Sequence, residues 1–111
     1  MSERDRIILQ KILKYINEAM SYTEGMDFGS FSQDSKTMSA TAFALGQIGE
    51  LAKEVSSEIE SKYPHLPWKG MRGMRNRIVH DYENVDLNML WDVVSNYLPE
   101  LIGQINNILK D

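Results

Sequence analysis

The stretch that decides the fold runs from residue 38 to residue 59 and reads MSATAFALGQIGELAKEVSSEI. Its apolar and small residues recur every three or four positions, which is the spacing of one buried face on an α-helix. The series consists of Met38, Thr41, Ala42, Leu45, Ile48, Gly49, Ala52, Val55 and Ile59. It predicts a single helix of about six turns, along which Gly46 and Gly49 leave room for a neighbouring helix to approach closely.

Three further helices are predicted on either side of this stretch. Apolar residues keep the helical period over residues 3–22, 67–81 and 87–108. Pro64 and Pro67 end the long second helix, because each proline lacks an N–H donor and disfavours helix in the residue before it. No stretch alternates apolar and polar residues as a strand does. We therefore expect an all-α protein, an up-and-down antiparallel four-helix bundle formed as a single domain by residues 1–111.

Smaller signals mark where these helices begin and bend. Residues 25–35 are rich in Gly, Ser and Asp and predict a loop, which ends where Ser32 or Asp34 caps the second helix. Pro67 suits the first turn of the third helix, and Asp86 is expected to be the N-cap of the fourth. Pro99 should bend the fourth helix without ending it, because the apolar period continues on both sides.

The composition narrows the functional classes. The chain has 111 residues, a formal net charge of -4 and no cysteine. An acidic protein does not wrap nucleic acid in a basic surface, so any contact with RNA or DNA should be local, and disulfide or thiolate chemistry is excluded. No segment has the roughly 18 apolar residues that a membrane-spanning helix needs, and the polar start at residues 1–6 is unlike a signal peptide. We expect a soluble cytoplasmic protein that does not bind membranes.

Positive charge is concentrated in one part of this acidic chain. No acidic residue occurs from Ser61 to His80. The same stretch contains two lysines, three arginines and both histidines, namely Lys62, His65, Lys69, Arg72, Arg75, Arg77 and His80. It leads into residues 75–82, which read RNRIVHDY and place a guanidinium, an imidazole and a phenol close together. A local positive field of this kind suits a phosphate-bearing ligand even when the net charge is negative.

Helical geometry favours a site formed by residues from two chains. On an ideal helix Arg72, Asn76 and His80 form one row, whereas Arg75 and His80 lie about 140° apart around the axis. A single helix can aim both at one phosphate only if it loosens at His80. The alternative is that a two-fold partner brings a second copy of both residues to a shared cleft. We expect the second arrangement, a homodimer, because two long apolar stripes also exceed what one small core needs.

The chemistry that these residues support without a metal is RNA transesterification. His80 could take the proton of a ribose 2'-hydroxyl or return one to the departing 5'-oxygen, and Arg75 could offset charge growing on the phosphate. Asn76 and Arg72 would add contacts to the phosphate or ribose. A metal site is disfavoured because the two histidines lie on opposite sides of a proline break, and no glycine loop has the spacing of a phosphate cradle. We therefore expect no metal and no cofactor.

Each of these residues also has a structural interpretation. The arginines and His80 could simply be a solvated face that the dipole favours near the end of a helix. The methionines Met71, Met74 and Met89 could be core residues or could line a partner interface. Glu50 could be a buried partner of an arginine or an exposed residue at the edge of its helix.

The motif Arg75-x-x-x-x-His80-x-Tyr82, with Asn76 directly after the arginine, resembles the signature of the HEPN superfamily, and in particular its HepT-like toxins. The resemblance extends over nearly the whole chain in the same order. It includes residues 48–50, 67–68, 71–76 and 85–86, and then Trp91 and residues 98–101.

This resemblance implies a homodimeric helical bundle that is a metal-independent ribonuclease, with Arg75 and His80 in catalysis. It also implies a toxin–antitoxin system of type VII, in which a minimal nucleotidyltransferase of the MntA type neutralises the toxin by attaching AMP to Tyr82. Two alternatives stay open. One is a non-catalytic HEPN module that binds nucleotides or RNA and partners a nucleotidyltransferase, and the other is a purely structural interaction bundle.

Overall fold

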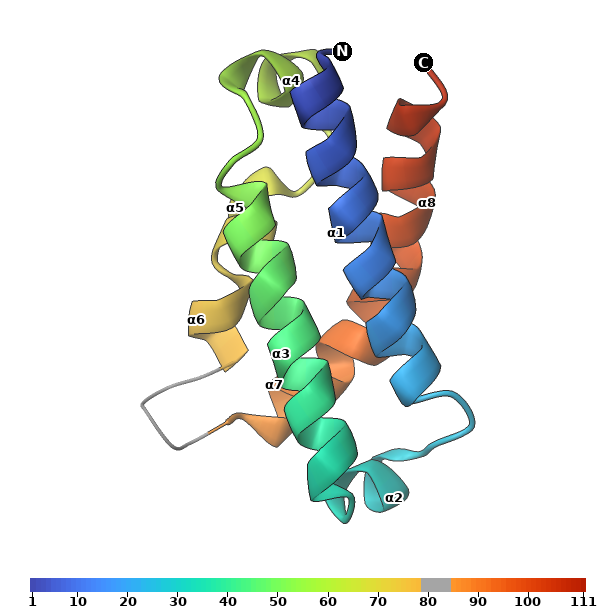
Figure 1. Ribbon diagram of the computed structural model, residues 1–111. Helices are drawn as coiled ribbons and strands as arrows, with labels where there is room; N and C mark the ends of the chain where they lie inside the picture. Colours follow the sequence, from blue (N-terminus) through green and yellow to red (C-terminus); the bar gives the residue numbers. More distant parts are fainter. Residues whose placement is uncertain (79–84) are drawn as a thin grey trace.

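A computed structural model of the chain describes residues 1–78 and 85–111, and over these residues it contains helices and no strand. Three long helices dominate: α1 (Glu3–Tyr22), α3 (Ser35–Ala52) and α8 (Leu98–Leu109). Helices α1 and α3 run antiparallel side by side, and α1 also packs against α8 (Figure 1). The all-α prediction is confirmed for the described residues. None of the helices described there is both long enough and apolar enough to cross a membrane.

Side-chain caps fix the starts of these helices. Ser2 accepts a hydrogen bond from the backbone N–H of Asp5 at 3.0 Å and caps α1. Asp34 caps α3 through the N–H of Thr37 at 3.0 Å, which confirms one of the two predicted caps. The predicted N-cap Asp86 accepts from the N–H of Met89 at 3.1 Å and begins α7 (Leu87–Asp92). The first predicted helix agrees with α1 at both ends.

The predicted loop over residues 25–35 was wrong in part, because it contains the short helix α2 (Phe28–Ser32). Asp27 and Ser30 form a reciprocal capping box, in which each side chain accepts from the backbone N–H of the other. Phe31 is fully buried and tilts against Trp91, with 5.0 Å between the ring centroids. A capping box and one buried aromatic are enough to form a turn of helix in a stretch whose composition is typical of a loop.

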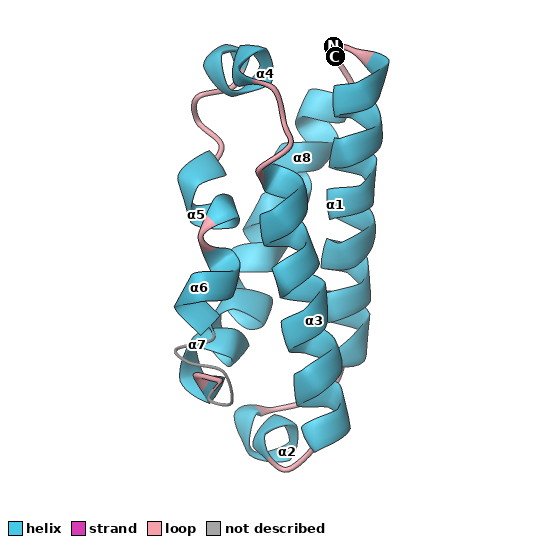
Figure 2. Ribbon diagram, turned by 60° about the vertical axis from the view of Figure 1, so that its left-hand side comes forward, coloured by secondary structure: helices cyan, strands magenta, loops and turns pink. Residues whose placement is uncertain are grey.

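The second predicted helix is also corrected, because α3 ends at Ala52 and a separate helix, α4 (Ser57–Lys62), follows. The break exists because Ser56 turns toward α1. Its N–H and its hydroxyl donate to the buried carboxylate of Asp5 at 3.0 and 2.7 Å, and its Oγ then caps α4. Figure 2 shows α4 at the end of the molecule where both termini lie. The apolar period continued across this break, since Val55 and Ile59 are both buried.

The third and fourth predicted helices are subdivided as well. Over the described residues the third consists of α5 (Trp68–Arg72) and α6 (Met74–Ile78), separated at Gly73, and Pro67 is the N-cap rather than a first-turn residue. Its predicted end at Asp81 lies outside the described residues. In the fourth, α7 is followed by a π-helical turn, η1 (Val93–Tyr97), and then by α8. Pro99 has no N–H and its ring would clash with a carbonyl one turn earlier, so the turn before it widens while the helix continues. The prediction that the helix continues through Pro99 is therefore confirmed, and the predicted bend stays a prediction.

Candidate functional site

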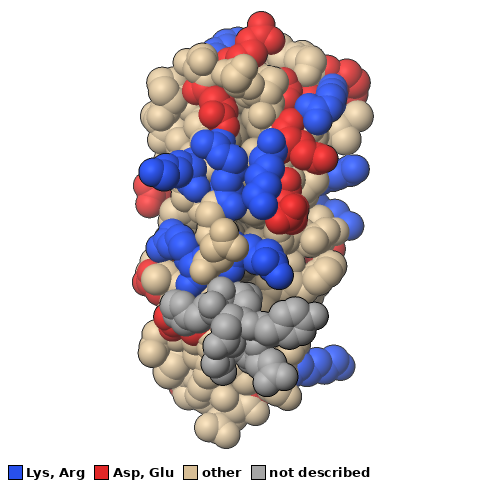
Figure 3. Space-filling view, turned by 90° about the vertical axis from the view of Figure 1, so that its left-hand side faces the viewer, with Lys and Arg blue, Asp and Glu red and all other residues tan. Residues whose placement is uncertain are grey.

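A band of positive charge lies on the face formed by α5 and α6, and we call Lys69, Arg72, Arg75 and Arg77 the basic band. Figure 3 shows Lys and Arg side chains gathered across the middle of this face. Three members of the band are exposed, and Arg72 is partly buried. The segment that bears them is short, so its position depends on what lies beneath it.

Four buried side chains anchor this segment to the core, namely Met71, Met74, Ile78 and Trp68, each with at most 5% of its surface exposed. The first two are therefore core residues, which answers the question left open by the sequence. Met89, the third methionine in question, is only partly buried and packs against the edge of the same core.

The backbone of the basic band lies directly against α3 at Gly49. A Cβ atom added at Gly49 would lie 3.2 Å from the carbonyl oxygen of Met71 and 3.7 Å from the backbone nitrogen of Arg75. The predicted close approach is thus confirmed at this glycine. It is not seen at Gly46, where an added Cβ would meet none of the described residues within 4 Å.

The charges of the basic band differ in their surroundings. Arg72 forms an ion pair with Glu60 of α4, so part of its charge is already balanced. Arg77 reaches the sulfur of Met89 at 3.5 Å, which is a weak contact. Arg75 is exposed and has no ion pair with a carboxylate in residues 1–78 and 85–111. Arg75 is therefore the member of the band whose guanidinium is most available to an incoming phosphate.

Glu50 is not the partner of an arginine. Its side chain is 55% exposed and pairs with Lys53 at 3.0 Å, three residues further along the chain. Of the two possibilities raised by the sequence, the exposed position is therefore the correct one. Among the described residues, the carboxylate that pairs with the basic band belongs to Glu60, which no helical spacing on α5 could have indicated, because it lies beyond the break at Pro64.

The structure tests the predicted site only in part. Arg75 and Asn76 are consecutive exposed residues of α6, and Arg72 precedes them on α5. His80 and Tyr82 lie outside the described residues, so their predicted roles stay predictions. Over the part of the chain that is described, no three His, Asp or Glu side chains are grouped in a way that could hold a metal ion.

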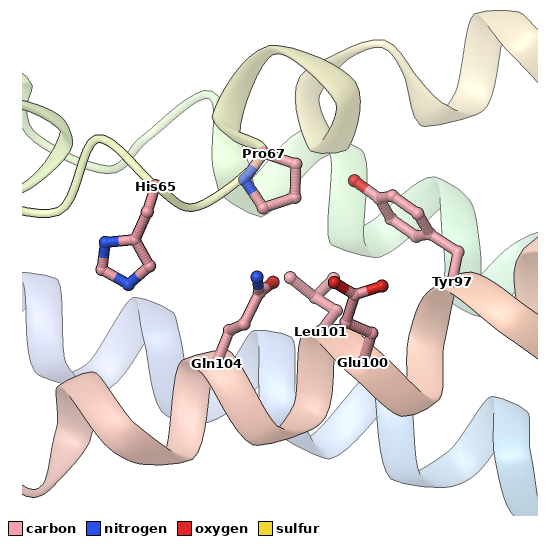
Figure 4. A pocket seen from close by; sticks show the side chains of 6 residues that line it. All are labelled: His65, Pro67, Tyr97, Glu100, Leu101 and Gln104. Atoms are coloured by element: carbon pink, nitrogen blue, oxygen red, sulfur yellow. The ribbon is translucent and has the colours of Figure 1, made fainter.

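A hollow near the basic band was missed by sequence reasoning. It has a volume of about 200 Å³ and lies between the segment that leads into α5 and one face of α8 (Figure 4). Its lining consists of His65, Pro67, Tyr97, Glu100, Leu101 and Gln104. The available signal was three polar side chains at positions 97, 100 and 104, a spacing that places them on one side of a helix.

Tyr97 forms one end of this hollow. Its hydroxyl oxygen is buried and has no hydrogen-bond partner among the described residues. A Cβ atom added at Gly70 would lie only 3.0 Å from that oxygen. The phenol of Tyr97 therefore fits beneath α5 because residue 70 is a glycine. Burial raises the pKa of Tyr97, the positive charge of Arg77 lowers it, and the negative charge of Glu100 raises it further. The positive charge of Arg77 therefore acts on the Tyr97 side of the hollow.

Comparisons with known proteins agree on one family. A family model described as Ribonuclease HepT-like matches residues 12–108. The chain is 36% identical over 112 aligned residues to a protein of Methanocaldococcus jannaschii that is provisionally named an RNase, with all of this chain and 93% of that relative covered. It is 31% identical over 110 residues to "Probable ribonuclease HepT" of Thermococcus cleftensis, with 99% of this chain and 100% of that protein covered. No solved structure matches the chain.

Proposed function

We propose that this chain, which belongs to the HepT-like ribonuclease family, is a metal-independent endoribonuclease that acts in the cytoplasm. The observation that carries the proposal is the exposed guanidinium of Arg75, which has no carboxylate partner among the described residues and is followed directly by the amide of Asn76. A free guanidinium binds a phosphate diester through paired charge-assisted hydrogen bonds. The RNA backbone supplies such a diester at every nucleotide.

The proposed reaction is an internal transesterification. The ribose 2'-oxygen attacks the adjacent phosphorus, the bond from phosphorus to the 5'-oxygen breaks, and the products carry a 2',3'-cyclic phosphate and a 5'-hydroxyl. His80 removes the proton from the 2'-hydroxyl and a proton is returned to the leaving 5'-oxygen, while Arg75 offsets the charge that builds on the phosphate. Asn76 orients the phosphate or ribose. Arg72 contributes a phosphate contact by exchanging Glu60 for the RNA backbone.

The test is cleavage of an end-labelled RNA by the purified protein in excess EDTA, with His80→Ala as the comparison. We expect cleavage by the wild type in EDTA, products that end in a cyclic phosphate, and no cleavage by His80→Ala at unchanged thermal stability. Full cleavage by a folded His80→Ala protein would contradict the mechanism. Loss of activity on chelation would point to a metal enzyme, and RNA binding without any cleavage would favour a non-catalytic binding module.

We further propose that the active unit is a homodimer whose cleft takes Arg75 and His80 from both chains. The angular separation of these residues on an ideal helix supports it. So does apolar surface left uncovered in one chain, of which Phe43, with 63% of its surface exposed, is the largest example among the described residues. Sedimentation should give a dimer, and mixing inactive Arg75→Ala with inactive His80→Ala chains should restore some cleavage. A fully active monomer would exclude this arrangement.

The proposed regulation is that of a toxin paired with an MntA-type nucleotidyltransferase antitoxin, which attaches AMP to Tyr82. Tyr82 follows His80 by two residues, so an added AMP would place a bulky anion against the basic band and exclude RNA by both charge and volume. Incubation with the partner enzyme and Mg-ATP should add the mass of AMP to the wild type and not to Tyr82→Phe. Neutralisation of the wild type without any mass change would show that the activity is not controlled by AMP on Tyr82.

A further inference from the structure

We propose that the hollow between the start of α5 and α8 is a subsite for one splayed-out RNA base, and that Glu100 makes this subsite prefer guanine. The inference rests on the proposed ribonuclease function and adds a base preference to it. The hollow is called the base pocket below, and its lining is that of Figure 4. It was not among the sites predicted from the sequence.

The size and shape of the base pocket suit a single planar group. Its volume of about 200 Å³ falls below the roughly 300 Å³ at which pockets for drug-sized ligands begin. Figure 4 shows His65 and Pro67 on the segment above the pocket, facing Gln104, Leu101 and Glu100, which rise from α8. A ring held between two such layers would have apolar and imidazole surfaces on its faces and polar groups at its edge. Single-stranded RNA is recognised in this way, by bases that leave the stack.

The lining of the pocket disfavours three other kinds of ligand, namely anions, metal ions and purely apolar groups. The carboxylate of Glu100 repels a free phosphate or another anion, although the neighbouring basic band would attract one. A metal ion is disfavoured because the described lining of the pocket offers one carboxylate and one imidazole. A purely apolar ligand would leave the polar groups of Gln104 and Tyr97 without partners. A neutral group that donates hydrogen bonds from its edge avoids all three problems, because it is not repelled by Glu100, needs no set of metal ligands and can pair with the polar side chains.

Guanine is the base whose edge matches a carboxylate best. Its N1–H and its exocyclic N2 amino group are adjacent donors, and the two oxygens of Glu100 can accept from both at once. Adenine, cytosine and uracil each present an acceptor beside a donor on the corresponding edge, so they form fewer bonds to a carboxylate. The amide of Gln104 can bond to the remaining edge of the base, because an amide both donates and accepts.

The pocket is also close enough to the basic band for one RNA strand to use both. Gly70, which covers the Tyr97 hydroxyl, directly follows Lys69 of the band. Arg77, at the other end of the band, is within electrostatic reach of Tyr97. A strand whose phosphates lie on the band can therefore turn one base over α5 into the pocket. The phosphate contacts would position the strand, and the base contact would set where it is cut.

The direct test is an NMR titration of the full-length protein with guanosine, adenosine, cytidine and uridine. We expect guanosine to shift the signals of residues 97–104 and of the Gln104 side chain, and to bind most tightly of the four. Glu100→Gln keeps the size of the side chain but turns an amide donor toward the donors of guanine, so it should weaken guanosine binding roughly tenfold. Glu24→Gln, an exposed glutamate in the turn after α1, is the matched control and should change nothing.

A second arm maps cleavage sites on a mixed-sequence RNA. The wild type should cut preferentially beside guanine, and Glu100→Gln should lose this preference, whereas Glu24→Gln should retain it. The two proposals fail separately. Guanosine binding that depends on Glu100 in a protein without nuclease activity would support the pocket and contradict the function. Cleavage without any base preference, together with equal binding of all four nucleosides or none, would overturn the pocket and leave the function standing.

Discussion

The pair of helices α1 and α3 and the segment formed by α5 and α6 are built in opposite ways. The two helices of the pair are 20 and 18 residues long, are capped by side chains and bury a continuous apolar face. The helices α5 and α6 are five residues each, and α5 has no side-chain cap. They carry the basic band over only a few buried residues. The comparison suggests that the first region supplies stability and the second supplies the charged surface, so mutations in the two should affect different measurements.

The largest expected effect on stability comes from the core of α3. Leu45→Ala removes a side chain with no exposed surface and should lower the free energy of unfolding by about 2–5 kcal/mol, through lost burial and a residual cavity. Asn76→Ala, on the exposed face of α6, should change it by less than about 0.5 kcal/mol. Urea unfolding followed by circular dichroism measures both. Equal losses in the two variants would remove the distinction between the regions.

The next effect tests the contact that joins the two regions. Gly49→Ala places a methyl group 3.2 Å from the backbone of Met71 and should be destabilising by about 1–3 kcal/mol, because backbone cannot yield as a side chain can. Gly46→Ala is the matched control on the same helix. Its added methyl group meets none of the described residues within 4 Å, and the variant should be stabilised by about 0.5–1 kcal/mol, since alanine favours helix over glycine. If both substitutions were stabilising, the close approach at Gly49 would not position α6.

The third effect depends on pH and concerns the N-terminal end of α1. Burial alone would raise the pKa of Asp5, but hydrogen bonds from Ser56 and Ser2 outweigh it and hold that pKa below its ordinary value. The ionised carboxylate therefore stabilises the fold above a pH of about 4, and this contribution is lost as the pH falls through the folded pKa. Asp5→Asn should cost about 1–3 kcal/mol at pH 7, with a difference from the wild type that shrinks below pH 4. A constant difference from pH 7 to pH 3 would contradict this.

Apolar periodicity was enough to predict the regular part of the fold. The bounds of α1, the caps Asp34 and Asp86, and the close approach at Gly49 all follow from local patterns that the structure retains. The breaks could not be predicted in this way. The turn after Ala52 depends on Ser56 reaching Asp5, which is 51 positions away in the sequence, and no local pattern encodes such a contact.

The same difference between local and long-range features applies to the candidate site. The basic band could be predicted because its residues are close together in the sequence and no acidic residue interrupts them. The ion pair between Arg72 and Glu60 and the base pocket could not, because both join residues on either side of a proline break or from separate helices. Composition near a motif can therefore indicate a charged surface, whereas its counter-ions and neighbouring pockets depend on the tertiary fold.

The central claim is that Arg75 acts in catalysis and is not merely one of several surface charges. The most direct measurement compares RNA cleavage by Arg75→Ala and Arg77→Ala, two exposed arginines on the same short helix. We predict that Arg75→Ala lowers the cleavage rate about 100- to 1,000-fold at unchanged melting temperature, because it removes the group that offsets charge on the phosphate. Arg77→Ala should lower the rate less than about tenfold, through weaker RNA binding that added salt mimics. Equal, salt-dependent losses in the two variants would contradict the claim and would leave the basic band as a binding surface only.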